Sequence, residues 1–435
     1  MTGANPLEIP AYDTSGEAPD ALYVDQARVP CALAPTEIIA LLARSELEAA
    51  PTVMIRPGLA LIGGRPVVAA STDRPADFGA KVAAKMVNYS EVDPKRIYFF
   101  GLVPFDPTSQ KTQISLPAFS ITLEGVSASV CTIGTTLQRA QELMVSIQRL
   151  LGSAVSLGGD PAPLGAPRVA AVLPALAFTE DDSAWLEKAR SAIELIRSGR
   201  FEKLVLSRRS LMELSEPLAR SESLLRLTRY YPGALSFSFR HLLGATPELL
   251  IRREGESLES HPLAGTASSG DEAALLASVK DNHEHRVVVS HIESRLAPLV
   301  ERVEVASAPS ITSFGDICHL GTQIKGFLPP SQKPTSLELL LAIHPTPAVA
   351  GVPQREAVVE IQSLEDEPRH YYAGAIGYEN LAGDGEWHLV IRTVAIGDRN
   401  VEFQAGVGIV AESDPMGELA EVQSKLTSML PIVIA

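Results

Sequence analysis

Three charged residues near the C-terminus, Glu418, Glu421 and Lys425, recur at the spacing of one helical face. Asp414 and Pro415 predict where this helix begins, since aspartate caps helices and proline suits the first helical position. The apolar stripe that should face the core is Leu419, Val422, Leu426 and Met429. The charges lie one position round from that stripe, at a border where a carboxylate needs a partner. An ion pair between Glu421 and Lys425 and a ligand site both fit this helix.

A second predicted helix also brings two carboxylates to an apolar border. In VKDNHEHRVVVSHIESRL, Asp281 and Glu284 stand three residues apart, and the apolar stripe is Val288, Ile292, Leu296 and Leu299. Two such helices would repel each other unless a cation lay between them. Oxygen ligands without cysteine suit Mg²⁺, and two solvated helix edges are the alternative. His283 and His285 are more typical of hydrogen-bonded structure than of metal ligands.

Candidate acid–base groups lie in apolar surroundings. Lys203, in FEKLVLSRR, alternates with Val205 and Ser207 on one strand face. A lysine there usually extends to the strand edge, but enclosure would make it a candidate general base. Burial of Glu248, in GATPELLI, would raise its pKa and keep a proton for donation. Arg392, in LVIRTVA, is suited to binding a carboxylate.

Three short segments could let a ligand approach the backbone. SHPLAGTASS contains Gly265 and the Thr266 hydroxyl, and FQAGVGIV contains Gly406 and Gly408. HPTPAVAGVP is a proline-stiffened loop in which the small Ala348 leaves room beside a ligand. None of the three matches a Walker A loop or a dinucleotide fingerprint, and each alone is typical of a plain turn.

Length and composition limit the function classes. A chain of 435 residues with a net charge of −15 has no basic stripe for nucleic acid, although a local positive pocket could still bind a small anion. Three distant cysteines without a CxxC predict a reducing compartment and no thiolate metal site. We expect no signal peptide and no membrane span, and therefore a cytoplasmic protein.

Element patterns predict an α+β fold in which antiparallel sheet dominates. Strands are expected at 52–64, 96–105, 235–240, 247–253, 372–378, 387–396 and 400–405. Helices are expected at 136–151, from 181 to a stop at Gly199, and at 271–303, 353–363 and 415–430, with an interruption at Pro298 as an alternative for the third. The Gly- and Pro-rich segment 152–168 is the clearest composition break, which we interpret as a loop crossing one composite domain, residues 1–435.

Together these residues resemble the chorismate-utilising enzymes, and the isochorismate synthases in particular. The matching stretches run in family order from about residue 180 to the C-terminus: FEKLVLSR, LLGATPELLIR, HPLAGT, KDNHEHRVVV, CHLGT, HPTPAVAGVP, YYAGAIGY, GDGEWHLVIR and AGVGIVAESDPMGELAEVQSK. Residues 180–435 are thus the motif-bearing catalytic part, and residues 1–165 are an N-terminal part without recognised motifs. One departure is Val407, where Ala is common between the two glycines.

The resemblance implies a chorismate-binding fold like that of anthranilate and aminodeoxychorismate synthases, a large antiparallel β-sandwich core with helices outside. It implies Mg²⁺ held by Glu284 and Glu421, with Asp281 and Glu418 in support. Lys203 matches the base that activates water, and Glu248 matches the acid. The positions that match substrate-binding groups are Gly265, Thr266, His319, Ala348, Tyr372, Arg392, Gly406, Gly408 and Lys425. The implied reaction is isomerisation of chorismate to isochorismate, by water addition at C2 and loss of the C4 hydroxyl.

Two positions discriminate within the family. Aminodeoxychorismate synthases have Lys in place of Ala264, and salicylate synthases favour Thr in place of Ala348. We therefore expect isochorismate as the end product. The alternatives are a salicylate synthase, which adds pyruvate elimination, and a non-catalytic chorismate-binding module. We expect a monomer, with a weak homodimer as the alternative, and the downstream pathway (siderophore, menaquinone or salicylate) is left open.

Overall fold

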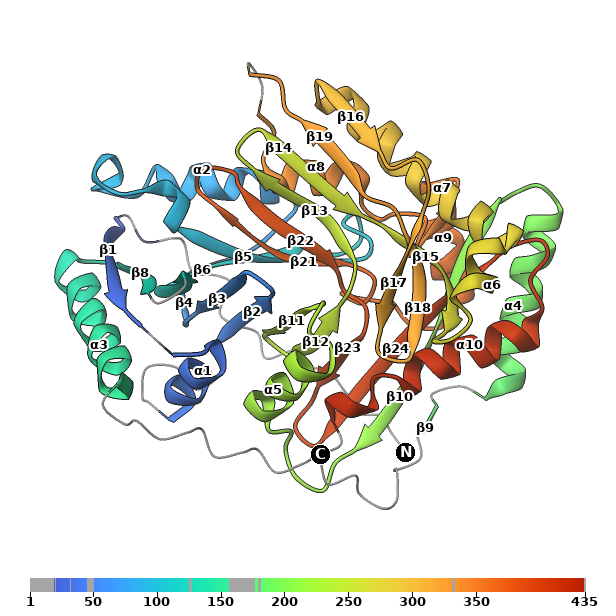
Figure 1. Ribbon diagram of the computed structural model, residues 1–435, viewed down its shortest axis with the longest axis horizontal. Coiled ribbons are helices and arrows are strands. Elements are labelled where there is room, and N and C mark those ends of the chain that lie inside the picture. Colours follow the sequence, from blue (N-terminus) through green and yellow to red (C-terminus); the bar gives the residue numbers. More distant parts are fainter. Residues whose placement is uncertain are drawn as a thin grey trace.

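The computed structural model describes residues 19, 21–31, 33–44, 51–124, 127–155, 177–178, 181–330 and 333–433. Two large sheets and one small sheet make up the interior, and helices pack outside them (Figure 1). Every ladder between the described strands is antiparallel. The predicted α+β fold with an antiparallel core is therefore confirmed.

The two large sheets each combine strands from both ends of the sequence. The first runs in the order β1 (Tyr23–Pro30), β8 (Ser127–Gly134), β7 (Phe119–Glu124), β3 (Leu59–Gly63), β2 (Thr52–Arg56), β11 (Leu235–Phe239), β12 (Leu242–Thr246), β23 (Thr393–Ile396), β24 (Asn400–Ile409), β10 (Lys203–Glu213) and β20 (Gly351–Val352), with β9 (Ala177–Phe178) also on β10. The second runs in the order β16 (Arg302–Val305), β19 (Ile324–Phe327), β14 (Ser257–His261), β13 (Leu249–Glu254), β22 (Gly385–Leu389), β21 (Ala375–Asn380), β5 (Tyr98–Val103), β6 (Thr112–Pro117) and β4 (Pro66–Thr72). Pairing of β2 with β11 and of β5 with β21 joins the N-terminal part to the motif-bearing part. That residues 1–435 form one composite domain stays a prediction, which this continuity favours.

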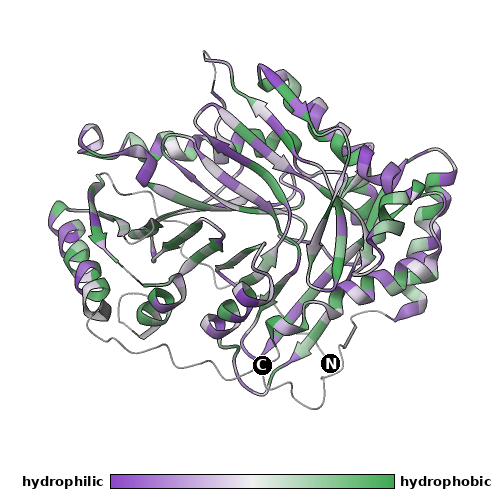
Figure 2. Cartoon of the chain, in the orientation of Figure 1, coloured by the Kyte–Doolittle hydropathy of each residue, from purple (hydrophilic) through white to green (hydrophobic). Residues whose placement is uncertain are grey.

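The small sheet and the helices complete the fold. The small sheet is β15 (Leu263–Ser268), β18 (Ile317–Gly321) and β17 (Ser310–Phe314). The α-helices are α1 (Pro35–Arg44), α2 (Phe78–Ala83), α3 (Leu137–Val155), α4 (Asp182–Arg197), α5 (Arg220–Tyr230), α6 (Glu272–Ala277), α7 (Val279–Leu296), α8 (Ser336–Ile343), α9 (Gln354–Leu364) and α10 (Pro415–Thr427). Short 3-10 turns are η1 (Pro75–Asp77), η2 (Tyr89–Glu91), η3 (Pro94–Arg96), η4 (Ala297–Leu299) and η5 (Leu430–Ile432). Figure 2 shows that the outer helices carry both polar and apolar faces, as expected of helices that cover a core.

Helix α10 forms as its sequence predicts. The Asp414 carboxylate accepts a hydrogen bond from the Gly417 N–H at 2.9 Å, with Pro415 at the first helical position. The predicted apolar stripe is buried, and Ala420, Ser424 and Thr427 are exposed on the opposite side. Helix α10 packs on β24, and α7 packs on β15 of the small sheet (Figure 1). These contacts bring the two carboxylate-bearing helices to one end of the large sheets.

Several predicted elements are wrong in their extent, and the strand expected over 52–64 is a hairpin of β2 and β3. The helix expected over 271–303 is divided at Ser278, which leaves the helical conformation so that its side chain can accept from the Asp281 N–H. The strand expected over 387–396 is divided between β22 and β23, where Arg392 has a φ of 53°. That left-handed conformation cannot continue a strand. The strand expected over 372–378 begins only at Ala375.

A buried ion cluster joins the two large sheets. The Glu386 carboxylate on β22 accepts from Arg56 Nε of β2 at 2.7 Å and from Arg252 Nε of β13 at 2.8 Å. Burial would raise the pKa of Glu386, but His388 and the two arginines outweigh it and hold that pKa well below its usual value. The cluster therefore ties β2 of the N-terminal part to the second large sheet, close to the connections between the sheets that carry Glu248 and Arg392.

Some sequence predictions concern segments with little structural description. Of the composition break at 152–168, the first four residues belong to α3 and the others lie outside the described residues. Gly199 ends α4 with a φ of 79°, as predicted. All three cysteines are free and buried. Among the helices that the structure describes, none has the length and apolar content needed to span a membrane.

Candidate active site

A cavity that opens to solvent lies among β10, β24, β15, β18, α7, α10 and the proline-rich loop 344–353. It is lined by all the predicted site residues except Lys203 and Glu418. Both exceptions lie directly behind a residue that lines the cavity, because Lys203 pairs with Glu284 and Glu418 pairs with Lys280. The fold thus brings residues from all nine sequence motifs to one cavity.

The predicted base is buried in an ion pair. Lys203 begins β10, its side chain is 1% exposed, and its Nζ lies 2.7 Å from Glu284 Oε1. Burial would raise the pKa of the Glu284 carboxyl, but the Lys203 ammonium outweighs it and lowers that pKa. Gly408 makes room for the pair, since a Cβ there would lie 2.5 Å from Glu284 Oε1 and 2.9 Å from Lys203 Cε. A proton-accepting role for Lys203 therefore requires the neutral amine, which has a free lone pair, in place of the ammonium that pairs with Glu284.

The predicted acid is buried and not ion-paired. Glu248, between β12 and β13, is 2% exposed, and its Oε1 has no hydrogen-bond partner among the described residues. Burial raises the pKa of this carboxyl to about 8, although Lys203 and Arg392 act in the opposite direction. Glu248 therefore holds its proton at neutral pH, as predicted, and faces the cavity as a potential donor.

The two carboxylates of α10 are held by lysines. Lys425 Nζ lies 2.6 Å from Glu421 Oε1 and donates to the Gly406 carbonyl at 3.1 Å. The predicted ion pair therefore exists, and it borders the cavity. Glu418 Oε1 accepts from Ser413 Oγ at 2.6 Å and from Lys280 Nζ of α7 at 2.8 Å. Burial raises the pKa of Glu418, while its contact with Lys280 acts to lower it.

Arg392 and His319 form the positive wall of the cavity. Arg392 is 6% exposed, its Nε has no hydrogen-bond partner in the described part of the chain, and burial lowers its pKa. Its Nη2 lies 3.4 Å from His319 Nε2, and the other ring nitrogen of His319 lies 3.1 Å from the Gly265 carbonyl. Burial, followed by Arg392 and Lys425, lowers the pKa of His319 to about 3, so the imidazole is neutral. A neutral ring that donates to Gly265 can accept from Arg392.

The glycine turn of HPLAGT lies against α7. Gly265 has a φ of 76°, and a Cβ there would lie 2.9 Å from the Asp281 side chain. Thr266 Oγ1 lies 3.2 Å from His319 Nδ1. Asp281 is tied to Ser278, which caps its helix. Glycine is therefore required here for both its conformation and its size.

The proline-rich loop forms another wall. Ala348 lines the cavity, as do Ala264 and Tyr372, whose pKa burial raises to about 12. Arg369 donates to the Val349 carbonyl of the loop at 2.7 Å and to the Val205 carbonyl of β10 at 2.6 Å. The unusual Val407 is buried in the core and does not line the cavity. Valine in place of alanine at position 407 therefore does not narrow the cavity, whose wall here is formed by Gly406 and Gly408.

The carboxylates suit a hard divalent cation. Repulsion between the two acidic helices, from which the sequence predicts a metal, is however not sufficient evidence for one. Among the described residues, no group of three His, Cys, Asp or Glu side chains converges as a ready-made metal cage. Repulsion between the helices is relieved by Lys203, Lys280 and Lys425. Glu284 and Glu421 nevertheless face one cavity, and two carboxylates suffice for Mg²⁺, which takes water and substrate oxygens as other ligands. The donor set therefore fits this ion.

The histidines of the α7 motif are placed as structural groups. His285 is buried, with Nε2 2.6 Å from Thr322 Oγ1, and His283 is exposed 3.2 Å from Glu202. Sequence reasoning missed Lys280, Arg369 and Gln404, which all line the cavity. Lys280 stands next to Asp281 in the same motif. Its partner, Glu418, is 138 residues away, and nothing in the neighbouring sequence indicates that pairing.

Known proteins match the part of the chain that contains the cavity residues. The sequence model of the family described as chorismate binding enzyme matches residues 70–434, so the match begins well before the motif-bearing part. The isochorismate synthase DhbC of Bacillus subtilis is 37% identical over 254 residues, which are 54% of this chain and 64% of that protein. The salicylate biosynthesis isochorismate synthase of Pseudomonas aeruginosa is 34% identical over 58% of this chain and 55% of its own length.

The chain therefore spans less than two thirds of the length of these two relatives in the aligned region. The solved structure of MenF, the menaquinone-specific isochorismate synthase from Escherichia coli, superposes with a TM-score of 0.76. That superposition covers 96% of each chain at 22% identity, and the likeness at this identity concerns the fold alone.

Proposed function

Since the chain belongs to the chorismate binding enzymes, we propose that it is an isochorismate synthase, an isomerase that converts chorismate to isochorismate. The observation that carries the proposal is the buried, protonated Glu248, whose Oε1 has no partner among the described residues, facing the same cavity as Glu284 of the Lys203–Glu284 pair. Binding alone would need neither a neutral carboxylic acid nor a buried lysine, whereas exchange of a hydroxyl group between two ring positions needs both an acid and a base.

Arg392 and Lys425 would bind the two carboxylates of chorismate. The guanidinium of Arg392 is buried with an unpartnered Nε, and a buried donor of this kind gains most from an anionic acceptor. Lys425 lies on the neighbouring wall, 12% exposed and already in contact with the Gly406 carbonyl. These cations give the cavity a local positive potential within a chain of net charge −15.

Lys203 and Glu248 would carry the two proton transfers. Starting as the neutral amine, Lys203 takes a proton from the water whose oxygen bonds to C2, the ring double bonds shift, and the C4–O bond breaks. Glu248 gives its proton to the departing C4 hydroxyl, which leaves as water. Lys203 thereby becomes an ammonium and Glu248 a carboxylate. The reverse reaction uses the same two groups with their roles exchanged.

Glu284 and Glu421 would hold Mg²⁺, with Asp281 and Glu418 in support. Bound there, Mg²⁺ would neutralise the ring carboxylate of the substrate and withdraw electrons from the ring. Binding of the ion by Glu284 would also weaken the contact between this carboxylate and Lys203, and so favour the neutral amine that the base needs. The Gly408 position, free of a side chain, allows the Glu284 carboxylate to lie against both the lysine and the cavity.

Ala348 and Ala264 support isochorismate as the end product. Both side chains line the cavity, at the positions where salicylate synthases favour Thr and aminodeoxychorismate synthases have Lys. We also propose a reducing, cytoplasmic location, which the three free cysteines support.

The test is a product analysis with the purified chain. Incubation with chorismate and Mg²⁺ at neutral pH should yield isochorismate, separated by liquid chromatography, with little pyruvate in a coupled lactate dehydrogenase assay. Stoichiometric pyruvate with salicylate would assign the chain to the salicylate synthases. Chorismate binding without any product would identify a non-catalytic module.

A further inference from the structure

Three glutamates, two that line the cavity and Glu418 directly behind its wall, are each held by a different lysine. Lys203 pairs with Glu284, Lys425 pairs with Glu421, and Lys280 pairs with Glu418. The first two lysines already have proposed roles as base and substrate ligand. Lys280 has none, although it lines the cavity and connects α7 to α10. Its side chain is 38% exposed, whereas that of Glu418 is only 4% exposed.

We propose that Lys280 is a resident counter-ion of the carboxylate cluster, which a divalent cation must displace, so that this lysine sets the metal affinity of the empty site. The inference rests on the proposed use of Mg²⁺ at this site. Lys280 is thus a positioning residue, which acts on the metal through Glu418.

Charge balance is the physical reason. A buried carboxylate without a partner is costly, and the Ser413 hydroxyl that also bonds Glu418 Oε1 carries no charge. With all three ion pairs formed, the three glutamates are neutralised before any metal arrives. An incoming dication must then compete with an ammonium 2.8 Å from the Glu418 oxygen. Without Lys280, the cluster holds one uncompensated negative charge that a dication would satisfy.

The sign of this effect distinguishes the proposal from a structural role. Loss of a residue that only supports the site should weaken metal binding, because the ligands become less ordered. Loss of a competing counter-ion should strengthen it. The expected size is roughly a 2- to 5-fold tighter dissociation constant, the equivalent of one partly exposed ion pair.

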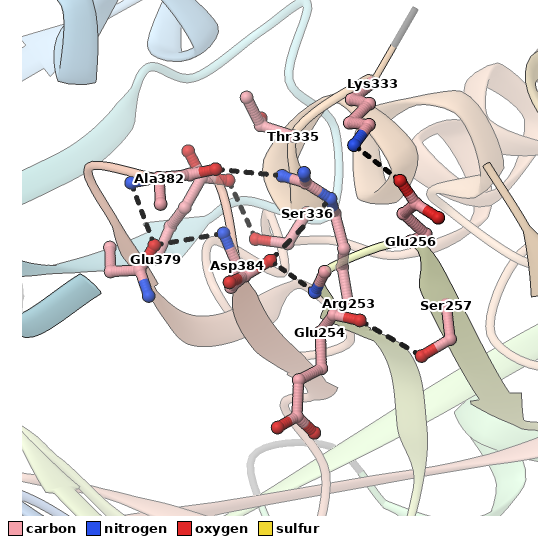
Figure 3. Close-up of polar contacts among 12 residues, drawn as sticks. Arg253, Glu254, Glu256, Ser257, Lys333, Thr335, Ser336, Glu379, Ala382 and Asp384 are labelled. Atoms are coloured by element: carbon pink, nitrogen blue, oxygen red, sulfur yellow. Dashed lines mark hydrogen bonds and ion pairs between the residues drawn. The ribbon is translucent and has the colours of Figure 1, made fainter. Parts of the chain in front are cut away.

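The experiment measures Mn²⁺ binding to the full chain without substrate, by the electron paramagnetic resonance signal of the free ion, at pH 8. Lys280→Met removes the ammonium but keeps an unbranched stem. The matched control is Lys333→Met, which removes the same charge from a pair outside the cavity (Figure 3). Lys333 Nζ lies 2.7 Å from Glu256 Oε1, and the lysine side chain is 41% exposed, much like that of Lys280.

We expect Lys280→Met to bind Mn²⁺ more tightly than the parent, and Lys333→Met and Lys280→Arg to bind it like the parent. Unchanged or weaker binding by Lys280→Met would overturn the proposal. So would an equal gain in Lys333→Met, which would indicate a general charge effect, or the absence of measurable binding in both the parent and Lys280→Met.

Thermal unfolding supplies a second readout. Lys280→Met should melt below the parent in EDTA and recover most of the difference in millimolar Mg²⁺, because the cation replaces the lost ammonium. A deficit that is the same at every Mg²⁺ concentration would mean a structural pair only. Neither readout needs turnover, so failure of this proposal is distinguishable from failure of the isomerase proposal, which the product analysis decides.

Discussion

Replacement of Glu248 by Gln tests the proposed acid most directly. The amide is nearly the same size as the carboxylic acid and can still form hydrogen bonds, but it cannot deliver an acidic proton. Glu248 is 2% exposed, its Oε1 has no partner in the described structure, and the amide oxygen of Gln can still accept the backbone hydrogen bond from Leu263. The fold should therefore tolerate Glu248→Gln.

The pKa of Glu248 decides how much of the acid form is available at neutral pH. Burial raises the pKa of Glu248 from 4.5 to about 8. At pH 7 about nine-tenths of the molecules then carry the proton, against ~0.3% at the ordinary value, which is roughly a 300-fold difference in available acid. Because a raised pKa keeps the acid form below pH 8, kcat/KM should be full below that value and fall as pH rises through it.

The assay follows isochorismate formation between pH 6 and 9 in the parent and in Glu248→Gln. We expect kcat to fall by roughly 10²-fold or more, the usual worth of a positioned proton donor, with the decline above pH 8 absent from the residual rate. Apparent chorismate affinity should change far less, because Arg392 and Lys425 supply the binding.

A second buried carboxyl provides the control. Burial raises the pKa of Glu379 to about 7, and its Oε2 accepts from Ser336 Oγ at 2.7 Å at the start of α8, outside the cavity (Figure 3). Glu379→Gln should keep both the rate and the decline near pH 8. The reasoning fails if Glu248→Gln retains kcat within a few-fold, or if Glu379→Gln removes the decline and Glu248→Gln does not.

Three other perturbations test the remaining roles. Lys203→Ala should lower kcat roughly 10²-fold with little change in KM, and its loss should not add to that of Glu248→Gln in a double variant; a raised KM with kcat intact would make Lys203 a binding charge. Glu421→Gln should weaken Mg²⁺ and chorismate binding together in calorimetric titrations, and EDTA should abolish turnover of the parent; parental binding of both ligands would contradict the metal role. Gly408→Ala places a methyl group 2.5 Å from Glu284 Oε1, so activity should drop by roughly 10²-fold while the melting temperature stays near the parental value. Full activity in that variant would mean that the Glu284 carboxylate moves aside without consequence.

Local sequence signals predicted the elements that depend on near neighbours. Helix α10 begins at Pro415 behind its Asp414 cap and buries its apolar stripe, because helix caps and periodicity act within a few residues. The i, i+4 pair of Glu421 and Lys425 is equally local. The breaks at Ser278 and Arg392 were missed, since a helix or strand pattern continues in sequence across a residue whose conformation is decided by its surroundings.

The membership of the site was predictable in a different way. The residue types of the motifs, together with the resemblance to the chorismate-utilising enzymes, placed Glu248, Glu284 and Arg392 among the site residues, and the structure brings all three to one cavity. The amino-acid sequence thus determined which chemical groups are present and that most of them meet. It did not show which groups face each other.

Only the tertiary structure decided the partners of the charges. Glu418 meets Lys280 across 138 residues, and Glu284 meets Lys203 across 81, through packing of α7 beside α10 and β10. The sequence argument that two acidic helices need a cation was sound, but lysines from other elements supply the positive charge. Periodicity reports which face of its own helix a residue occupies. The position of the oppositely charged group depends on how distant elements pack, and that is a property of the folded chain.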